Sequence, residues 1–180
     1  PNTPGLRKLQ EPHALGALVG AVIGTLDDVG RPRPVLLKLH PDAPDAELLA
    51  CARAALDAGA SGLIAVNTTV GRPAGLSHAG AGGLSGRPLA ERATRVTANL
   101  FDGLRREAPI IGVGGIFTGE EAIERVRAGA SALQAYTGFV YRGPRFPTRV
   151  HREMVEALDV LGVDRFVELV GVDAPRLRKG

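Results

Sequence analysis

The sequence predicts an α/β protein made of four consecutive strand–helix units of a (β/α)8 barrel. Short apolar runs alternate with longer amphipathic segments, which is typical of βαβ units and a parallel sheet. Two of these runs, residues 109–116 and 132–138, stop abruptly at glycine or at a small hydroxyl residue. Backbone amides at two such strand ends are what a phosphate site at the last two strands of a barrel requires.

The length of the chain fits only part of such a barrel. The chain has 180 residues, whereas a complete (β/α)8 barrel typically needs about 250. Residues 1–5 form a loop-like opening that starts with proline and follows no earlier element. We therefore expect residues 1–180 to be the C-terminal half of a single barrel domain, truncated from a longer polypeptide and without a second domain.

The first half of the chain predicts two helices and two strands. Helices are expected from Pro12 to about Asp28 and from residue 44 to the glycine at 59, and strands at 35–39 and 62–66. Both strand runs are almost wholly apolar, as in a buried parallel sheet. The expected buried faces of the two helices are Leu15, Leu18, Val22 and Leu26 in the first, and Leu48, Leu49, Ala52 and Leu56 in the second.

The second half continues the alternation after a long loop at 70–88. This loop is rich in glycine and serine, and loops of that length in compact domains are usually functional. Thr118 and Glu121 form a capping box for a helix that should end at Gly129. The remaining expected elements are helices at 89–106, 148–161 and 165–169 and strands at 110–113 and 132–136.

Composition excludes several classes of protein. The net charge is only +3, and the basic clusters near the C-terminus contain no interleaved aromatic residues, so nucleic-acid binding is not supported. No apolar stretch approaches the roughly 18 residues of a membrane span. Cys51, the single cysteine, is expected to be a buried apolar side chain. His40 and His78 lack partners at metal-ligand spacing, so no metal site is predicted.

Polar groups at two strand ends are the candidate chemistry of the chain. Lys38 is the one charged residue inside an apolar strand run, and a lysine in such a place is rarely buried without a partner. The interpretation is a fixed positive charge that faces an anionic cofactor or intermediate; a lysine that reaches the rim and pairs with a loop carboxylate is the alternative. The segment 67–69, Asn-Thr-Thr, could bind a planar polar ligand or simply form a turn.

Motifs along nearly the whole chain resemble those of class 2 dihydroorotate dehydrogenases, FMN enzymes that make orotate for pyrimidines. The motifs are residues 1–10 (PNTPGLRKLQ), Lys38 with Pro41-Asp42, residues 67–70 (NTTV), residues 82–89 (GGLSGRPL), residues 109–115 (PIIGVGG), and Tyr136-Thr137 with Gly143-Pro144. The first and third blocks are similar to class 2 rather than class 1.

The resemblance implies a role for each matching residue. Lys38 would be the catalytic residue, placed beside the FMN ring to stabilise negative charge there. Backbone groups would hold FMN, mostly its phosphate. The implied cofactor-binding residues are Lys38, Val66, Gly86, Gly115, Tyr136 and Thr137, and the implied binders of dihydroorotate or orotate are Asn2, Asn67 and Thr68. Val66 departs from the family, which more often has threonine there.

The resemblance also implies parts that lie outside this sequence. The serine that acts as base in class 2 enzymes would stand immediately before Pro1. The first FMN contacts and the helices that bind quinone would also precede it. We therefore expect this chain alone to be soluble and inactive. The full-length protein is expected as a peripheral protein on the cytoplasmic side of the bacterial inner membrane, oxidising dihydroorotate with a quinone as acceptor.

Two other interpretations stay open at this point. The chain could come from another FMN- or phosphate-binding barrel, such as a class 1 relative with a different electron acceptor and a cysteine as base. It could also be a non-catalytic half-barrel that binds phosphate ligands or pairs with another half-barrel. A flavin spectrum would separate the flavin enzymes from the last alternative.

Overall fold

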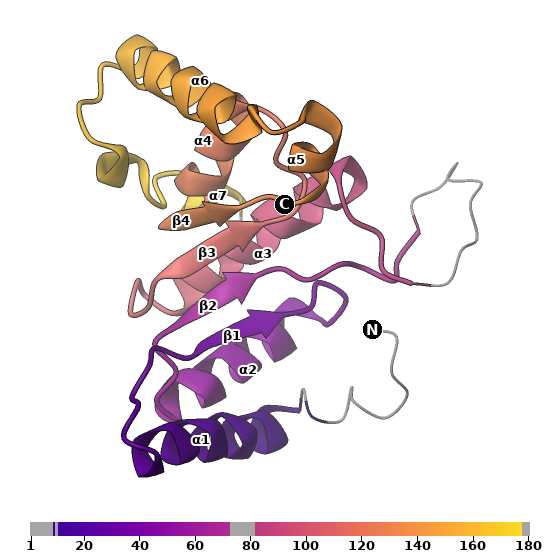
Figure 1. Cartoon of the computed structure of the whole chain (residues 1–180), viewed down its shortest axis with the longest axis vertical. Helices are drawn as coiled ribbons and strands as arrows, with labels where there is room; N and C mark the ends of the chain where they lie inside the picture. The colour runs from indigo at the N-terminus through magenta and orange to yellow at the C-terminus, as the bar shows by residue number, and fades with distance from the viewer. Residues whose placement is uncertain (1–8, 10, 73–81, 178–180) are drawn as a thin grey trace.

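The computed structural model describes residue 9, residues 11–72 and residues 82–177. Its centre is a four-stranded parallel sheet in the order β1-β2-β3-β4 (Figure 1). The strands are β1 (Leu36–Leu39), β2 (Gly62–Ala65), β3 (Ile110–Val113) and β4 (Ala132–Gln134). Sequential parallel strands joined by helices confirm the four predicted βα units.

Helices cover one face of this sheet. Helix α2 packs on β1, α3 on β2 and β3, and α4 on β4, while α1 packs on α2 and α6 on α4. The main core lies between the strands and these helices and includes Leu39, Leu63, Ile110 and Leu100. The helices are α1 (Pro12–Asp28), α2 (Asp45–Asp57), α3 (Ala90–Gly103), α4 (Gly119–Arg127), α5 (Thr137–Arg142), α6 (Phe146–Leu161) and α7 (Ala174–Leu177), with 3-10 turns η2 (Arg87–Leu89) and η3 (Phe166–Leu169).

Most expected boundaries hold within two or three residues. The predicted capping box of α4 is present, because the Thr118 hydroxyl accepts from the Glu121 N–H and the Glu121 carboxylate accepts from the Thr118 N–H. Two short helices were missed. Helix α5 has only six residues and α7 only four, which is too short for an apolar period to show.

The expected buried face of α1 was partly wrong. Leu15 and Val19 are buried, whereas Leu18 and Val22 are 44% and 42% exposed. The reason is that α1 contacts the rest of the chain mainly through α2, where Val19 packs with Ala55 and Ala60. A helix that is apolar around most of its circumference can bury only the side that meets its single neighbour.

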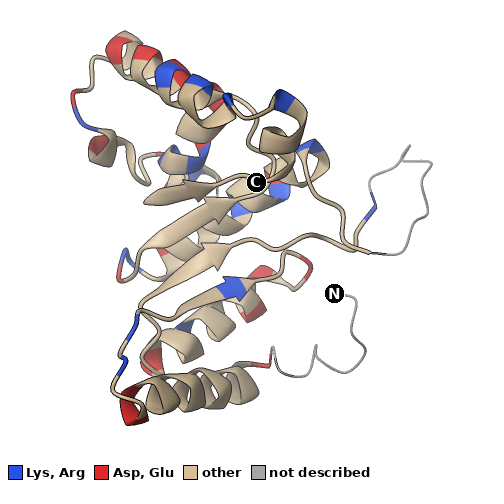
Figure 2. Cartoon of the chain, viewed as in Figure 1, with Lys and Arg blue, Asp and Glu red and all other residues tan. Residues whose placement is uncertain are grey.

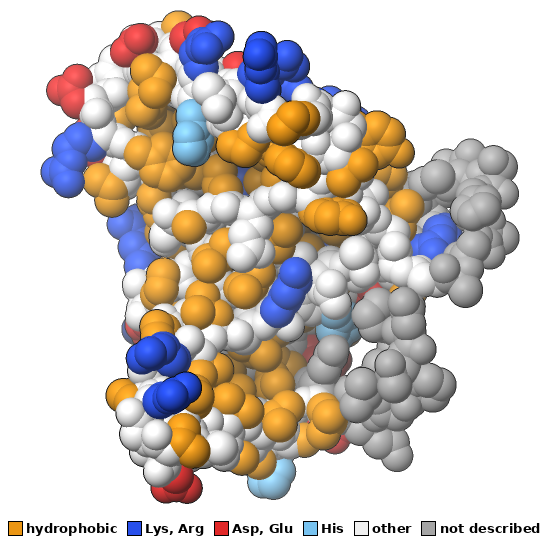
Figure 3. Space-filling view, viewed as in Figure 1, with side chains coloured by type: hydrophobic (Ala, Val, Ile, Leu, Met, Phe, Trp, Pro, Cys, Tyr) orange, Lys and Arg blue, Asp and Glu red, His pale blue; other side chains and the backbone are white. Residues whose placement is uncertain are grey.

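The second face of the sheet is open in the described part of the chain. The strand register places Lys38, Ile64, Ile111 and Ala132 side by side across the four strands. Lys38 and Ala132 are exposed and the two isoleucines are half-buried, while Leu39, Leu63 and Ile110 on the opposite face are buried. Apolar side chains are visible over this face in Figure 3, and Figure 2 shows a basic segment in β1 on otherwise uncharged strands.

The outer strands of the sheet also carry unpaired edges. Within the described residues β1 pairs only with β2, and β4 pairs only with β3. Closed barrels remove such edges, so this arrangement corresponds to part of a barrel wall. Among the described helices, none combines the length and the apolar composition that crossing a membrane requires.

Candidate functional site

Three loops meet beyond the carboxyl ends of the strands. They contain Gly86, which follows the long loop after β2, Gly115, which follows β3, and Thr137, which begins α5 after β4. The Ser85 and Thr137 hydroxyls lie 2.9 Å apart, and a side chain on Gly86 would come within 3.0 Å of the Thr137 methyl group. The structure thus brings together Gly86 and Thr137, from different βα units, at the place where barrels carry their sites.

Two of the glycines in these loops have backbone conformations that other residues rarely adopt. Gly86 has φ 81° and Gly115 has φ 75°. A Cβ on Gly115 would lie 2.5 Å from Cα and 2.8 Å from N of Ala90, at the start of α3. A Cβ on Gly138 would collide with the Ile116 carbonyl oxygen. Side chains are therefore excluded at Gly115 and Gly138, and turns made of backbone alone can form a cradle for an anion.

Tyr136 and Val66 occupy different environments near these loops. Tyr136 is 77% exposed. The Val66 side chain is buried, and its N–H donates to the Val113 carbonyl at 3.1 Å. The peptide bond between Ala65 and Val66 is cis. Their assignment to cofactor binding stays a prediction.

Asp42 organises the loop that carries the predicted substrate residues. The Thr69 hydroxyl donates to one Asp42 oxygen, and the Val70 N–H donates to the other at 2.9 Å. Thr69 also exchanges two backbone hydrogen bonds with Leu84, at 2.7 and 3.1 Å. The Asn67 N–H donates to the Leu39 carbonyl at 2.7 Å. Asn67 and Thr68, both half-buried, thus lie on a fixed loop beside the end of β1, whereas Asn2 lies outside the described residues.

Lys38 differs from its expected environment. The sequence predicted a lysine inside a buried strand, but its side chain is exposed. The physical reason is that alternate residues of a strand face opposite sides, and Lys38 faces the open side of the sheet. The strand order places β1 next to β2, two strands from β3 and three from β4.

The loop between β3 and α4 is held by Glu121, the predicted capping-box residue, and by Arg87, which the sequence did not single out as a loop contact. Glu121 accepts from the N–H groups of Phe117 and Thr118 at 2.7 and 3.0 Å and forms an ion pair with Arg87 at 2.5 Å. The Arg87 guanidinium also lies 4.6 Å from the centre of the Phe117 ring. Arg87 follows Gly86 directly, so these contacts tie two of the three loops together.

Glu153 of α6 holds the other end of the same loop. It accepts from the Gly119 N–H at 2.6 Å and pairs with Arg142 at 3.0 Å. Arg142 also donates to the Phe117 carbonyl. The hydrogen bonds from Arg142 and then from Gly119 lower the pKa of the Glu153 carboxyl below its ordinary value of 4.5.

We expect the Glu153 contacts to make the stability of the folded protein depend on pH. A carboxyl whose pKa is lower in the folded state stabilises the protein above its unfolded pKa and loses this contribution as the pH falls through the folded value. Since both partners are about a third exposed, Glu153→Gln should lower the melting temperature of the full-length protein by only about 2 °C at pH 7. The difference should shrink below about pH 4. Equal differences at pH 7 and pH 3 would contradict this account.

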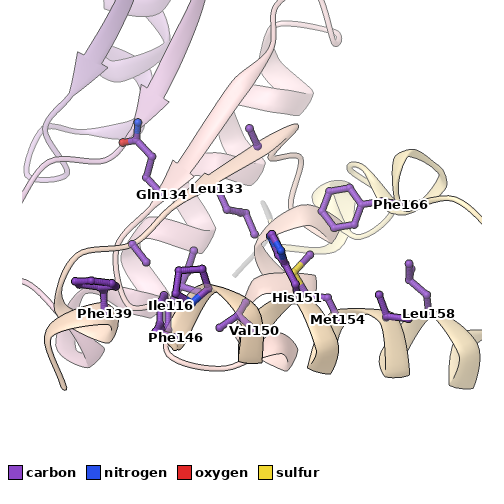
Figure 4. A pocket seen from close by; sticks show the side chains of 14 residues that line it. Ile116, Leu133, Gln134, Phe139, Phe146, Val150, His151, Met154, Leu158 and Phe166 are labelled. Atoms are coloured by element: carbon purple, nitrogen blue, oxygen red, sulfur yellow. The ribbon is translucent and has the colours of Figure 1, made fainter. Parts of the chain in front are cut away.

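A mostly apolar cavity lies between β4 and α6. It has a volume of about 660 Å³ and runs along the free edge of β4. Figure 4 shows Leu133, Val150, Met154 and Phe166 around it. Of the predicted site residues, none lines this cavity. Its position beside the edge of β4 that has no partner strand among the described residues makes it a gap in the wall of the sheet rather than a candidate active site.

Other reactive side chains offer no second site. Within the described ranges no group of three or more histidine, cysteine, aspartate or glutamate residues could hold a metal ion. Cys51 is buried in the main core, as expected from the sequence. Burial, with a smaller effect of Glu47, raises the pKa of its thiol.

Four parallel βα units with loops gathered at one end of the strands define half of a (β/α)8 barrel. The sequence profile of the dihydroorotate dehydrogenase family matches residues 1–158, and the chain belongs to this family. It is 43% identical over 182 residues to a dihydroorotate dehydrogenase (quinone) of Deinococcus deserti, covering 97% of this chain and 50% of that protein. It is 46% identical over 180 residues to the protein of the same name from Thermobifida fusca, with 96% and 48% covered.

Solved structures agree with the sequence comparison. The chain superposes on dihydroorotate dehydrogenase of Eimeria tenella in complex with ferulenol with a TM-score of 0.90 at 35% identity. This match covers 96% of the chain and 51% of the Eimeria protein. The resemblance and the fold class predicted from the sequence are confirmed. The chain spans about half the length of the relatives it matches.

Proposed function

We propose that this chain forms the C-terminal half of an FMN-dependent dihydroorotate dehydrogenase of the quinone class. The reaction is the oxidation of dihydroorotate to orotate in pyrimidine biosynthesis. The observation that carries the proposal is the similarity of nearly the whole chain to quinone-class enzymes at 43–46% identity. It also favours this class over the class 1 alternative.

Backbone geometry supports the cofactor assignment. Gly86, Gly115 and Thr137 belong to the loops that gather at the carboxyl ends of the strands, and the two glycines have positive φ angles. Amides of such turns can bind a phosphate closely. Bound there, FMN would supply the redox chemistry that amino-acid side chains lack, by accepting a hydride.

The chain's own residues would bind and orient the substrate. Lys38 places a positive charge on the open face of β1, where it would favour negative charge on the neighbouring flavin ring. Asn67 and Thr68 lie on the loop that Asp42 fixes, and their amide and hydroxyl groups can donate to and accept from a pyrimidine and its carboxylate. Asn2 is proposed as a further substrate contact. The proton from C5 would go to a serine in the preceding half.

The open face and the unpaired edges of the described sheet support the proposal that this chain is one half of a barrel. In the described residues Ile64 and Ile111 are only half-buried and one edge of β4 is unpaired, so further strands are needed to cover this wall. We propose that the preceding half closes the barrel and supplies the quinone site. Quinones are membrane-dissolved, so the full-length protein would associate peripherally with the cytoplasmic side of the inner membrane.

The isolated 180-residue chain should not oxidise dihydroorotate at a measurable rate. It lacks the proposed base, and such groups typically contribute about 10²- to 10⁴-fold to a rate. The measurement is dihydroorotate-dependent reduction of a quinone or a dye by the purified chain supplied with FMN. The full-length protein, assayed in the same way, is the positive control. Turnover by the isolated chain within tenfold of the control would contradict the proposed division of the site.

A further inference from the structure

Arg125 of α4 is a buried cation that forms no ion pair with a carboxylate among the described residues. Arg125 is only 2% exposed to solvent. The ion pairs formed by the described residues do not include it. A buried charge is costly unless hydrogen bonds or an opposite charge compensate it. Glu124 and Glu121 act on it through charge alone, so a buried cation at this place calls for a physical reason.

The guanidinium of Arg125 joins three backbone or hydroxyl acceptors behind the glycine loop. Its Nε donates to the Thr94 hydroxyl at 3.1 Å, and its Nη2 donates to the carbonyls of Ala90 at 3.1 Å and Gly114 at 2.9 Å. Its Nη1 has no hydrogen-bond partner among the described residues. The aliphatic part of the Arg125 side chain packs against β3 at Gly112, where a Cβ would lie 2.5 Å from the Arg125 Cγ.

The bond to the Gly114 carbonyl also determines where the next amide points. The peptide unit between Gly114 and Gly115 is planar, and in a trans peptide its C=O and N–H point in opposite directions. Because the carbonyl is directed at the buried guanidinium, the Gly115 N–H is directed away from it. Both glycines have positive φ, 111° and 75°, so without this bond the flexible turn could rotate the peptide.

We propose that Arg125 is a positioning residue that orients the Gly114–Gly115 peptide so that the Gly115 N–H faces the cofactor phosphate. This inference rests on the proposed function, which places the phosphate at that turn. Arg125 does not touch the phosphate. It acts through the Gly114–Gly115 peptide unit. The positive charge of Arg125 polarises this peptide, and the Gly115 N–H becomes a stronger hydrogen-bond donor.

The charge of Arg125 fits the same role. Burial lowers its pKa to about 10, against the smaller opposing effects of Glu124 and Glu121, so the group is still protonated at neutral pH. A positive charge fixed behind the turn, with little compensation nearby, favours an anion in front of it. A purely structural side chain would need the hydrogen bonds but not the charge.

The test compares FMN with riboflavin, which lacks the phosphate. Flavin-free full-length protein is titrated with each, and the ratio of the two Kd values gives the preference for the phosphate. Arg125→Met should reduce this preference on the order of tenfold while leaving riboflavin affinity unchanged. Arg125→Lys, which keeps the charge but loses the fork of donors, should give an intermediate preference. Arg127→Met is the matched control, because Arg127 lies on the same helix and pairs with Asp173 at 2.6 Å.

The outcomes separate this inference from the proposed function. Wild-type preference in Arg125→Met would overturn the positioning role, even if the melting temperature fell. If that variant does not fold, Arg125→Lys decides, and an unchanged preference there would overturn it equally. An equal loss in Arg127→Met would mean that any charge on α4 suffices, which also overturns it. Wild-type protein that binds riboflavin as tightly as FMN would instead refute the phosphate site itself.

Discussion

Gly115→Val should strip the flavin from the full-length protein and also destabilise it. The turn has φ 75°, and any Cβ at Gly115 meets the backbone of Ala90. A β-branched residue in this region of φ is a strong outlier, so the turn must move and carry its amide away from the phosphate. We expect a flavin-to-protein ratio near zero after purification, measured by absorbance beside circular dichroism. A folded variant with a full complement of FMN would show that the phosphate lies elsewhere.

Since Gly115→Val disturbs packing as well as binding, a milder pair of variants separates the two effects. Gly86 and Gly143 have similar backbone conformations, φ 81° with ψ −155° and φ 77° with ψ −175°. A Cβ on Gly143 meets nothing within 4 Å, whereas one on Gly86 reaches the Thr137 methyl group. Alanine at either position should cost about 1–3 kcal/mol in strain. Only Gly86→Ala should lose flavin, and equal flavin content in both would contradict the proposed cradle.

Lys38→Ala should slow flavin reduction by dihydroorotate about 10²-fold or more in the full-length protein, without emptying it of FMN. Loss of an electrostatic stabiliser of this kind typically costs on the order of 3 kcal/mol in the transition state. Retention of FMN is expected because β1 lies two and three strands from β3 and β4, which carry the loops of Gly115 and Thr137. Stopped-flow reduction of fully loaded enzyme measures the effect directly.

The control for Lys38 keeps its charge. Lys38→Arg should retain more of the reduction rate than Lys38→Ala, because a cation still extends from the open face of β1. An unchanged rate in Lys38→Ala would assign this lysine to solubility or to an ion pair with the remainder of the barrel. Loss of FMN from Lys38→Ala would instead place the phosphate nearer to β1 than we propose.

Most of the fold could be predicted from the sequence because the strands and the longer helices have strong local signals, which the short helices α5 and α7 lack. The strand at Ile110–Val113 and the capping box of Thr118 and Glu121 appear as expected. The buried face of α1 could not be predicted, since it depends on how many neighbours the helix meets. The exposure of Lys38 was missed for the same reason, because an apolar strand sequence predicts burial whether or not the second face of the sheet is covered.

The candidate site was only partly visible in the sequence. Glycines that follow short apolar runs indicated the loops, and the structure places Gly86 against Thr137. Two of the residues that hold these loops gave no such signal. Arg125 and Glu153 look like ordinary surface charges in the sequence, and only the fold shows that they bind the backbone at Gly114 and Gly119.

The most direct test of the central claim is the position of the FMN phosphate in a structure of the full-length protein with bound flavin. We predict phosphate oxygens within hydrogen-bond distance of the backbone amides of Gly115 and Thr137, with the flavin ring extending toward Lys38. A phosphate bound at any other part of the chain, or a protein that binds no flavin at all, would contradict the account.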